Sequence, residues 1–135
     1  TSWRAVGIWE TINKKESIHF IILNKSNSKM IGACDYTKIK NNKCWLGYSI
    51  SKSFEGNNIM YEALLLTNLY VENNLGVKKI IAGIFPKNER SIKLIRRLHF
   101  EYIDLKDELE IFSEIKTYDT HIQEMIEKSK LYIKS

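Results

Sequence analysis

The sequence has little cysteine and no long apolar run. Its two cysteines, Cys34 and Cys44, lie ten residues apart with no histidine at metal-ligand spacing, so the sequence predicts neither a zinc site nor a disulfide framework. We expect both to be small core residues. No apolar run approaches the roughly 18 to 20 residues that a transmembrane helix needs, and nothing resembles a signal peptide. A cytoplasmic protein with no membrane partner is therefore the default expectation.

The sequence also lacks internal repeats, low-complexity segments and any stretch that resembles an interdomain linker. Of its 135 residues, 44% are hydrophobic, which is enough to bury a sizeable core. We therefore expect a single domain over residues 1–135, present as a monomer or a homodimer.

The net charge of +5 is distributed unevenly along the chain. Residues 1–100 hold sixteen Lys or Arg against seven Asp or Glu, whereas residues 101–135 hold five against nine. The basic excess fits a polyanionic small ligand or nucleic acid, although Lys-rich proteins often carry such charge merely on a solvated surface. Nucleic acid is the weaker alternative, because the basic residues are not interleaved with aromatic residues in any recognisable binding module.

Hydrophobic periodicity predicts a chain of short strands and helices. The apolar stripe of the central helix is expected to bury Ile59, Ala63, Leu66 and Tyr70, with Met60, Leu64 and Val71 beside it. The predicted order is a helix at 3–16, an antiparallel meander of strands at 17–24, 30–37 and 44–51, a helix at 58–74, a strand at 77–85, a short helix at 88–98, a hairpin of 100–105 with 108–115, and a helical tail at 117–133.

The stretch from 45 to 64 carries the first chemical signal. An alternating strand leads through a polar turn that contains Gly56, Asn57 and Asn58 into the central helix. The first N–H groups of a helix lack internal partners and carry the positive end of its dipole, so this order favours an anion. Glycine also lets the backbone approach a phosphate closely. The sequence therefore predicts a phosphate site in this turn.

A second motif follows one strand later, P-K-N-E-R-S-x-x-L-x-x-x-L-H-F at 86–100. Together with G-Y-S-I-x-x-x-F-E-G-N-N-I-M-x-E-A-L at 47–64, it resembles the GCN5-related N-acetyltransferase (GNAT) family, in particular its branch of bacterial ribosomal-protein N-terminal (serine/alanine) acetyltransferases. The resemblance covers roughly residues 17–100. It implies an α+β (α/β) fold, with a mixed, mostly antiparallel twisted sheet and helices on both faces. There is no obvious room before Trp3 for the family's first strand and helix, so we expect the chain to be truncated at its N-terminus relative to the family, or its sheet to lack that first strand.

The resemblance also implies an activity: direct transfer of acetyl from acetyl-CoA to a primary amine in a ternary complex, without a metal. The amine would be a protein or peptide N-terminus or a small amine. The pantetheine arm would lie between the strands at 47–51 and 77–85, with a strand N–H polarising the acetyl carbonyl and Ser91 as the catalytic candidate that protonates the departing thiolate. The cofactor-binding residues implied are Ser49, Ile50 and Ser51 for the pantetheine arm, Glu55, Gly56, Asn57, Asn58, Ile59 and Met60 for the pyrophosphate, and Asn88 and Ser91 near the arm and the sulfur. Further positive charge for the phosphates could come from Lys52, Lys87, Arg90 and Lys93.

Four positions depart from the family pattern. Asn58 replaces a loop glycine, Met60 replaces a small residue and would add bulk near the phosphates, Trp45 replaces a glutamate that can act as a base, and His99 replaces a glycine. Asn and His tolerate positive φ, and Asn also caps helices, so Asn58 is expected to preserve the loop. A base on the protein stays open among His19, Asp35, Tyr48, Glu62 and His99, and an α-amino group with a pKa near 8 can react without one. The alternative function is a catalytically impaired relative that serves as a CoA-binding or protein-interaction module.

Overall fold

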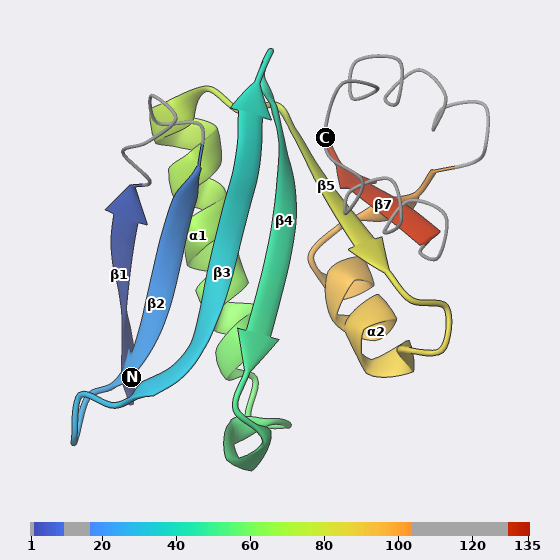
Figure 1. Cartoon of the computed structure of the whole chain (residues 1–135). Helices are drawn as coiled ribbons and strands as arrows, with labels where there is room; N and C mark the ends of the chain where they lie inside the picture. The colour runs from blue at the N-terminus through green and yellow to red at the C-terminus, as the bar shows by residue number, and fades with distance from the viewer. Residues whose placement is uncertain (1, 10–16, 104–129) are drawn as a thin grey trace. The chain divides into compact units, whose positions relative to one another are not determined.

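The computed structural model describes residues 2–9, 17–103 and 130–135 (Figure 1). They fall into two compact units, Thr1–Ile80 and Ile81–Ser135. The first unit contains strands β1 (Trp3–Trp9), β2 (Ile18–Asn24), β3 (Met30–Lys40) and β4 (Lys43–Ile50), the 3-10 turn η1 (Lys52–Phe54) and helix α1 (Ile59–Leu75). The chain passes into the second unit within β5 (Lys79–Ile84), which is followed by α2 (Glu89–Arg97), β6 (Glu101–Tyr102) and β7 (Lys130–Lys134).

Strands β1 to β4 form an antiparallel meander in chain order. The predicted meander of β2, β3 and β4 is confirmed, and β1 extends it. The helix predicted at 3–16 is wrong over residues 3–9, which pair with β2 from Trp3 opposite Asn24 to Trp9 opposite Ile18. A short helix that includes Gly7 would be only marginally stable by itself, whereas residues 3–9 form backbone hydrogen bonds along the edge of β2 when they are extended. Residues 10–16 lie outside the described part of the chain.

Helix α1 covers one face of the meander (Figure 1). The ring of Phe20 on β2 lies edge-to-face against Tyr36 of β3, at 5.9 Å between centroids, and against Tyr70 of α1, at 5.6 Å. The hydroxyl of Tyr36 hydrogen-bonds Thr67 Oγ1 at 2.8 Å and donates to Asn68 Oδ1. The buried side of the first unit therefore lies between α1 and the alternate strand residues that point towards it.

The extent of α1 matches the prediction, but the predicted inward stripe is partly wrong. Leu66 and Tyr70 are 58% and 40% exposed, while Thr67 and Asn68 are buried. The Tyr36 hydroxyl hydrogen-bonds Thr67 Oγ1 and Asn68 Oδ1, which offsets part of the cost of burying this polar pair, whereas Asn68 Nδ2 is buried with no hydrogen-bond partner among the described residues. A prediction from the apolar residues alone therefore assigns the wrong face of α1 to the core. The residues that α1 buries are Ile59, Met60, Ala63, Leu64, Thr67, Asn68 and Val71.

In the second unit, β7 lies between β5 and β6. The strand predicted at 77–85 and the helix predicted at 88–98 are confirmed as β5 and α2. The strand found opposite β6 is β7, with Tyr102 paired to Tyr132, so the helical tail predicted through 133 is wrong for 130–133. Leu131 and Tyr132 are buried in this pairing, which explains why they are extended. The predicted strand at 108–115 and the rest of the tail lie outside the described residues.

Both cysteine thiols are free and buried, as the sequence predicted. Burial raises the pKa of the Cys34 thiol and of the Cys44 thiol from 9.0 to about 12 each, because the thiolate would lose its hydration. Below pH 9 the thiols are protonated in both the folded and the unfolded state, so the stability is fully present there. As the pH rises from 9 towards 12 the unfolded thiols ionise while the folded thiols do not, so the free energy of unfolding falls.

We therefore expect neither thiol to react with a chromogenic disulfide reagent at pH 8 in the native protein. The same assay in denaturant should count two thiols, because unfolding restores their normal pKa and exposes them. Rapid native labelling of either cysteine would contradict the burial described here.

Candidate functional site

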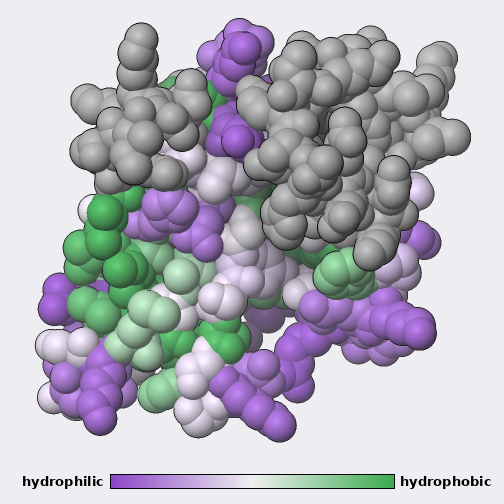
Figure 2. All heavy atoms as spheres, viewed as in Figure 1, coloured by the Kyte–Doolittle hydropathy of each residue, from purple (hydrophilic) through white to green (hydrophobic). Residues whose placement is uncertain are grey.

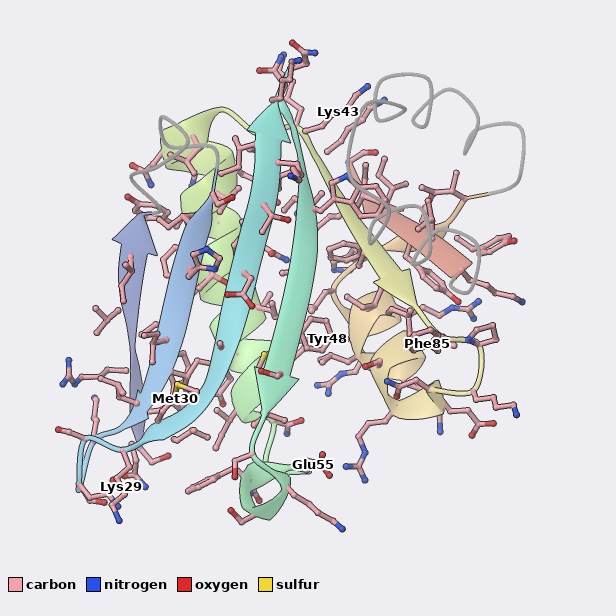
Figure 3. All side chains as sticks on the ribbon, viewed as in Figure 1. Lys29, Met30, Lys43, Tyr48, Glu55 and Phe85 are labelled. Carbon is pink, nitrogen blue, oxygen red and sulfur yellow. The ribbon has the colours of Figure 1, made fainter. Side chains whose placement is uncertain are left out.

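The turn predicted to bind phosphate joins the end of β4 to the start of α1. Ser49 and Ile50 end β4 opposite Ala33 and Gly32 of β3, and the N–H of Ser51 donates to the Ile31 carbonyl at 2.7 Å. After the single turn η1, the chain is exposed from Glu55 to Asn58 (Figure 3 labels Glu55). The strand, loop and helix thus follow in the predicted order, with the loop open to solvent.

Two residues of this loop adopt left-handed backbone conformations. Gly56 has φ +83°, and a Cβ added to it would meet nothing within 4 Å, so the backbone angle rather than the space requires glycine there. Asn58 has φ 57°, which confirms that Asn can take this conformation in the loop. Its side chain makes no capping hydrogen bond, so the expected capping role is wrong.

The next two positions contribute backbone to the loop and side chains to the core. Ile59 and Met60 are 7% and 6% exposed, and Met60 Sδ lies 3.6 Å from Cys34 Sγ on β3. The expectation that Met60 adds bulk above the loop therefore does not hold. The side chain fills the space between α1 and the meander.

Gly32 on β3 leaves no space for a side chain beside the end of β4. A Cβ added to Gly32 would lie 2.4 Å from the Ser49 carbonyl oxygen and 3.1 Å from Ile50 Cα. The register of β2 with β3 also shifts here, because Ile22 pairs with Gly32 while Leu23 pairs with Met30. The motifs did not point to Gly32, although a glycine inside a strand pattern is a signal for close backbone approach.

In the second unit, Asn88 and Ser91 are brought together at the start of α2. Asn88 is the N-cap residue, and its Oδ1 accepts a hydrogen bond from the Ser91 N–H at 3.2 Å. The Asn88 N–H in turn donates to the Phe85 carbonyl at 2.9 Å. The cap fixes the backbone at Ser91 and leaves Nδ2 as the donor that Asn88 can offer to a ligand. The basic residues named from the sequence are all exposed: Lys52 in the first unit, and Lys87, Arg90 and Lys93 in the second.

The five candidate bases differ in their surroundings. His19 on β2 and Asp35 on β3 are direct cross-strand partners, with 2.7 Å between Nδ1 and Oδ1. Glu62 Oε2 accepts a hydrogen bond from the Trp3 indole at 3.0 Å. The other two candidates are Tyr48, half-buried on β4, and His99, exposed after α2 with φ 69° as the sequence predicted for this position.

Trp45 is buried, at 5% exposed, and offers no group that can take a proton. Among the described residues, no group of three or more His, Cys, Asp or Glu side chains is placed to hold a metal ion. In the same part of the chain, no helix is long and apolar enough to cross a membrane.

Residues 1–101 match the family model of the acetyltransferase (GNAT) domain. The chain is 29% identical over 106 residues to the [ribosomal protein uS5]-alanine N-acetyltransferase of Escherichia coli (75% of this chain, 55% of the relative), and 30% identical over 94 residues to the probable N-acetyltransferase YjcK of Bacillus subtilis (67% and 52%). The chain thus matches about half the length of these relatives.

Solved structures show the same resemblance. The ribosomal-protein-S5-alanine acetyltransferase of Vibrio fischeri superposes with a TM-score of 0.63 at 27% identity, over 64% of this chain and 49% of that one. The Campylobacter jejuni N-acetyltransferase PseH, solved in complex with acetyl coenzyme A, shares the fold with a TM-score of 0.64 at 16% identity, over 90% of this chain and 70% of its own. The chain belongs to the GNAT acetyltransferase family.

Proposed function

We propose that this chain is the core of an N-acetyltransferase that moves an acetyl group from acetyl-CoA to a primary amine. The observation that carries the proposal is the loop from Ser51 to Asn58, in which Gly56 and Asn58 have left-handed backbone conformations and Asn58 directly precedes α1. Its backbone N–H groups and the helix dipole suit a pyrophosphate. A Cβ at Gly56 would stand in open space, so a phosphate can approach this backbone without a steric barrier.

The remaining roles are proposed from the family motifs at 47–64 and 86–100. The backbone of Ser49, Ile50 and Ser51 binds the pantetheine arm, and an N–H of this strand polarises the acetyl carbonyl. Asn88 Nδ2 donates to the arm, since Oδ1 is engaged by the helix cap. The Ser91 hydroxyl gives a proton to the thiolate as the carbon–sulfur bond breaks. The new bond forms between the amine nitrogen and the acetyl carbon, in one complex that holds both substrates.

For the acceptor, we favour the α-amino group of a protein. Two relatives, at 29% and 27% identity, are named as alanine acetyltransferases of a ribosomal protein, and the chain matches about half of the length of each. A small polyamine is the second candidate, because the spermidine/spermine N-acetyltransferase of Vibrio cholerae shares this fold with a TM-score of 0.64.

The test combines a binding assay and a product assay on the chain as it stands. Saturating acetyl-CoA should raise the melting temperature, since ligand at 100 times its dissociation constant stabilises by about 2.7 kcal/mol. Free CoA should then appear on addition of a short peptide that begins with Ala or Ser, or of spermidine. AMP at the same concentration is the control for the adenosine end alone. No thermal shift and no CoA release with any of the three amines would contradict the proposal.

The second candidate function is a domain that binds CoA without transferring its acetyl group. Trp45, which is buried and cannot take a proton, favours it. A thermal shift with acetyl-CoA but no release of CoA with any of the amines would support this alternative.

A further inference from the structure

Helix α1 carries apolar side chains on its outer side as well as on the side that packs against the meander. Leu65, Leu66 and Leu69 are 39%, 58% and 51% exposed, and Tyr70 is 40% exposed. The buried side of the same helix includes the polar pair that hydrogen-bonds Tyr36. A helix that is apolar all round is typically covered on every side. Packing against the meander therefore accounts for only one of the two apolar sides of α1.

The exposed positions form one continuous stripe, which we call the outer stripe of α1. They follow the i, i+3, i+4, i+7, i+8, i+11 spacing that places residues on one side of a helix. No charged residue lies between Glu62 and Glu72. A single exposed leucine is common on a protein surface, whereas a continuous apolar stripe is typical of an interaction surface. The members of the outer stripe are Glu62, Leu65, Leu66, Leu69, Tyr70 and Asn73.

The other open face of the first unit is interrupted by polar side chains. Because Phe20 contacts Tyr70 of α1, its strand neighbour His19 lies on the face of the meander that points away from α1. There His19 pairs with Asp35, next to Ile8 of β1. Figure 2 shows this face, where apolar side chains over β1 and β2 lie beside a hydrophilic spot over β2 and β3. The outer stripe of α1 has no such interruption.

The apolar part of the outer stripe is complementary to itself when two copies of α1 run antiparallel. If a two-fold axis crosses the helix pair midway between positions 67 and 68, Leu66 of each copy faces Leu69 of the other. The same axis places Leu65 opposite Tyr70, so each apolar side chain of the stripe meets another across the interface. Such pairs repeat on both sides of the axis, because the interface uses the same surface of both copies.

The polar ends of the outer stripe favour the same antiparallel arrangement. Glu62 of each copy lies opposite Asn73 of the other, whose side-chain amide can donate to the carboxylate. Glu62 Oε2 accepts a hydrogen bond from the Trp3 indole, and a carboxylate can accept several more. The two Glu62 residues are separated by eleven residues along the helices, or about 16 Å. A parallel pair would instead place these two negative charges side by side.

We propose that the outer stripe of α1 is the interface of a homodimer with two-fold symmetry, in which the two α1 helices pack antiparallel. Among the described residues of the first unit α1 is the only α-helix, so no other helix of that unit covers this side. One helix face is smaller than the roughly 800 Å² per partner that stable complexes bury, so the dissociation constant should be about 10–100 μM. The inference does not depend on the proposed acetyltransferase function.

The test is sedimentation velocity of the wild type, of Leu66→Lys and of Leu69→Glu at about 1–300 μM, a range that brackets the expected dissociation constant. The wild type should pass from the monomer mass to twice that mass. Each variant places two unpaired charges against leucine in the dimer, so its self-association should weaken at least tenfold. An equimolar mixture of the two variants should dimerise again. In the mixed dimer the introduced lysine faces the introduced glutamate, while the remaining Leu69 and Leu66 face each other.

Met30→Lys is the matched control, because Met30 is 63% exposed on β3 and lies outside the stripe. It should dimerise like the wild type. Both stripe positions are more than half exposed, so each variant should melt within about 3 °C of the wild type at low concentration, and the acetyl-CoA thermal shift should be unchanged. A wild type that stays monomeric throughout would overturn the proposal and leave the stripe for a partner other than a second copy. Dimerisation that both variants retain, or a mixture that does not recover it, would also overturn the proposal.

Discussion

A Gly32→Ala variant should unfold about 1–3 kcal/mol more easily than the wild type and bind acetyl-CoA at least tenfold more weakly. The added methyl group would lie 2.4 Å from the Ser49 carbonyl oxygen, a backbone atom that can move only if the end of β4 moves with it. The hydrogen bond from the Ser51 N–H to the Ile31 carbonyl, 2.7 Å long, would be strained by the same shift. Ser49 to Ser51 form the segment proposed to bind the pantetheine arm, so stability and affinity should fall together.

Chemical denaturation and an acetyl-CoA titration measure the two effects of Gly32→Ala separately. Gly47→Ala is the matched control for stability, because its Cβ meets nothing within 4 Å and its backbone is not left-handed. That control should melt at or slightly above the wild-type temperature, since alanine reduces the freedom of the unfolded chain. If Gly32→Ala melts and binds like the wild type, the close approach of β3 to β4 has no role in the site.

The sequence predicted the elements that local patterns determine. Strands β2 to β5 and both helices follow from alternation, helical spacing and turn residues. It did not predict β1, because the residues from Trp3 to Trp9 form a strand only where β2 offers them an edge. The pairing of β6 with β7 is likewise a contact between distant residues, as Tyr102 lies opposite Tyr132. β6 lies within the strand predicted at 100–105, but the residues of a single segment do not indicate which distant strand it pairs with.

For the candidate site, the motifs predicted which residues belong together better than they predicted what each side chain does. The left-handed backbone at Asn58 could be anticipated from the residue type, and Asn88 and Ser91 are indeed neighbours. The burial of Met60 could not be anticipated, because it depends on how α1 is rotated against the meander, which Tyr36 helps to determine through Thr67 and Asn68. The pairing of His19 with Asp35 depends on the register of β2 with β3, and the sequence alone did not fix that register.

Met60→Ala should cost about 2–5 kcal/mol of unfolding free energy, because it removes a buried side chain that contacts Cys34 in the core. Met30→Ala is the matched control: Met30 is 63% exposed, so its truncation should change the free energy by no more than about 0.5 kcal/mol. Thermal and denaturant unfolding of both variants measure the difference. Equal stabilities would mean that Met60 is not packed in the core.

Asn58→Gly, compared with Met60→Ala, tests whether the loop has lost its function. Asn58 already holds φ 57° and makes no side-chain cap, so glycine should leave the loop backbone unchanged and the acetyl-CoA affinity within about twofold. Met60 lies beneath the loop, so any loss of affinity in Met60→Ala should track its loss of stability. A tenfold gain in affinity from Asn58→Gly would instead mean that the native loop binds phosphate poorly, and would favour the impaired domain over the enzyme. An unchanged affinity would mean that the phosphate loop is intact. The departure from the family pattern that affects the chemistry would then be Trp45, which replaces a glutamate that can accept a proton, and activity would depend on whether another group accepts that proton.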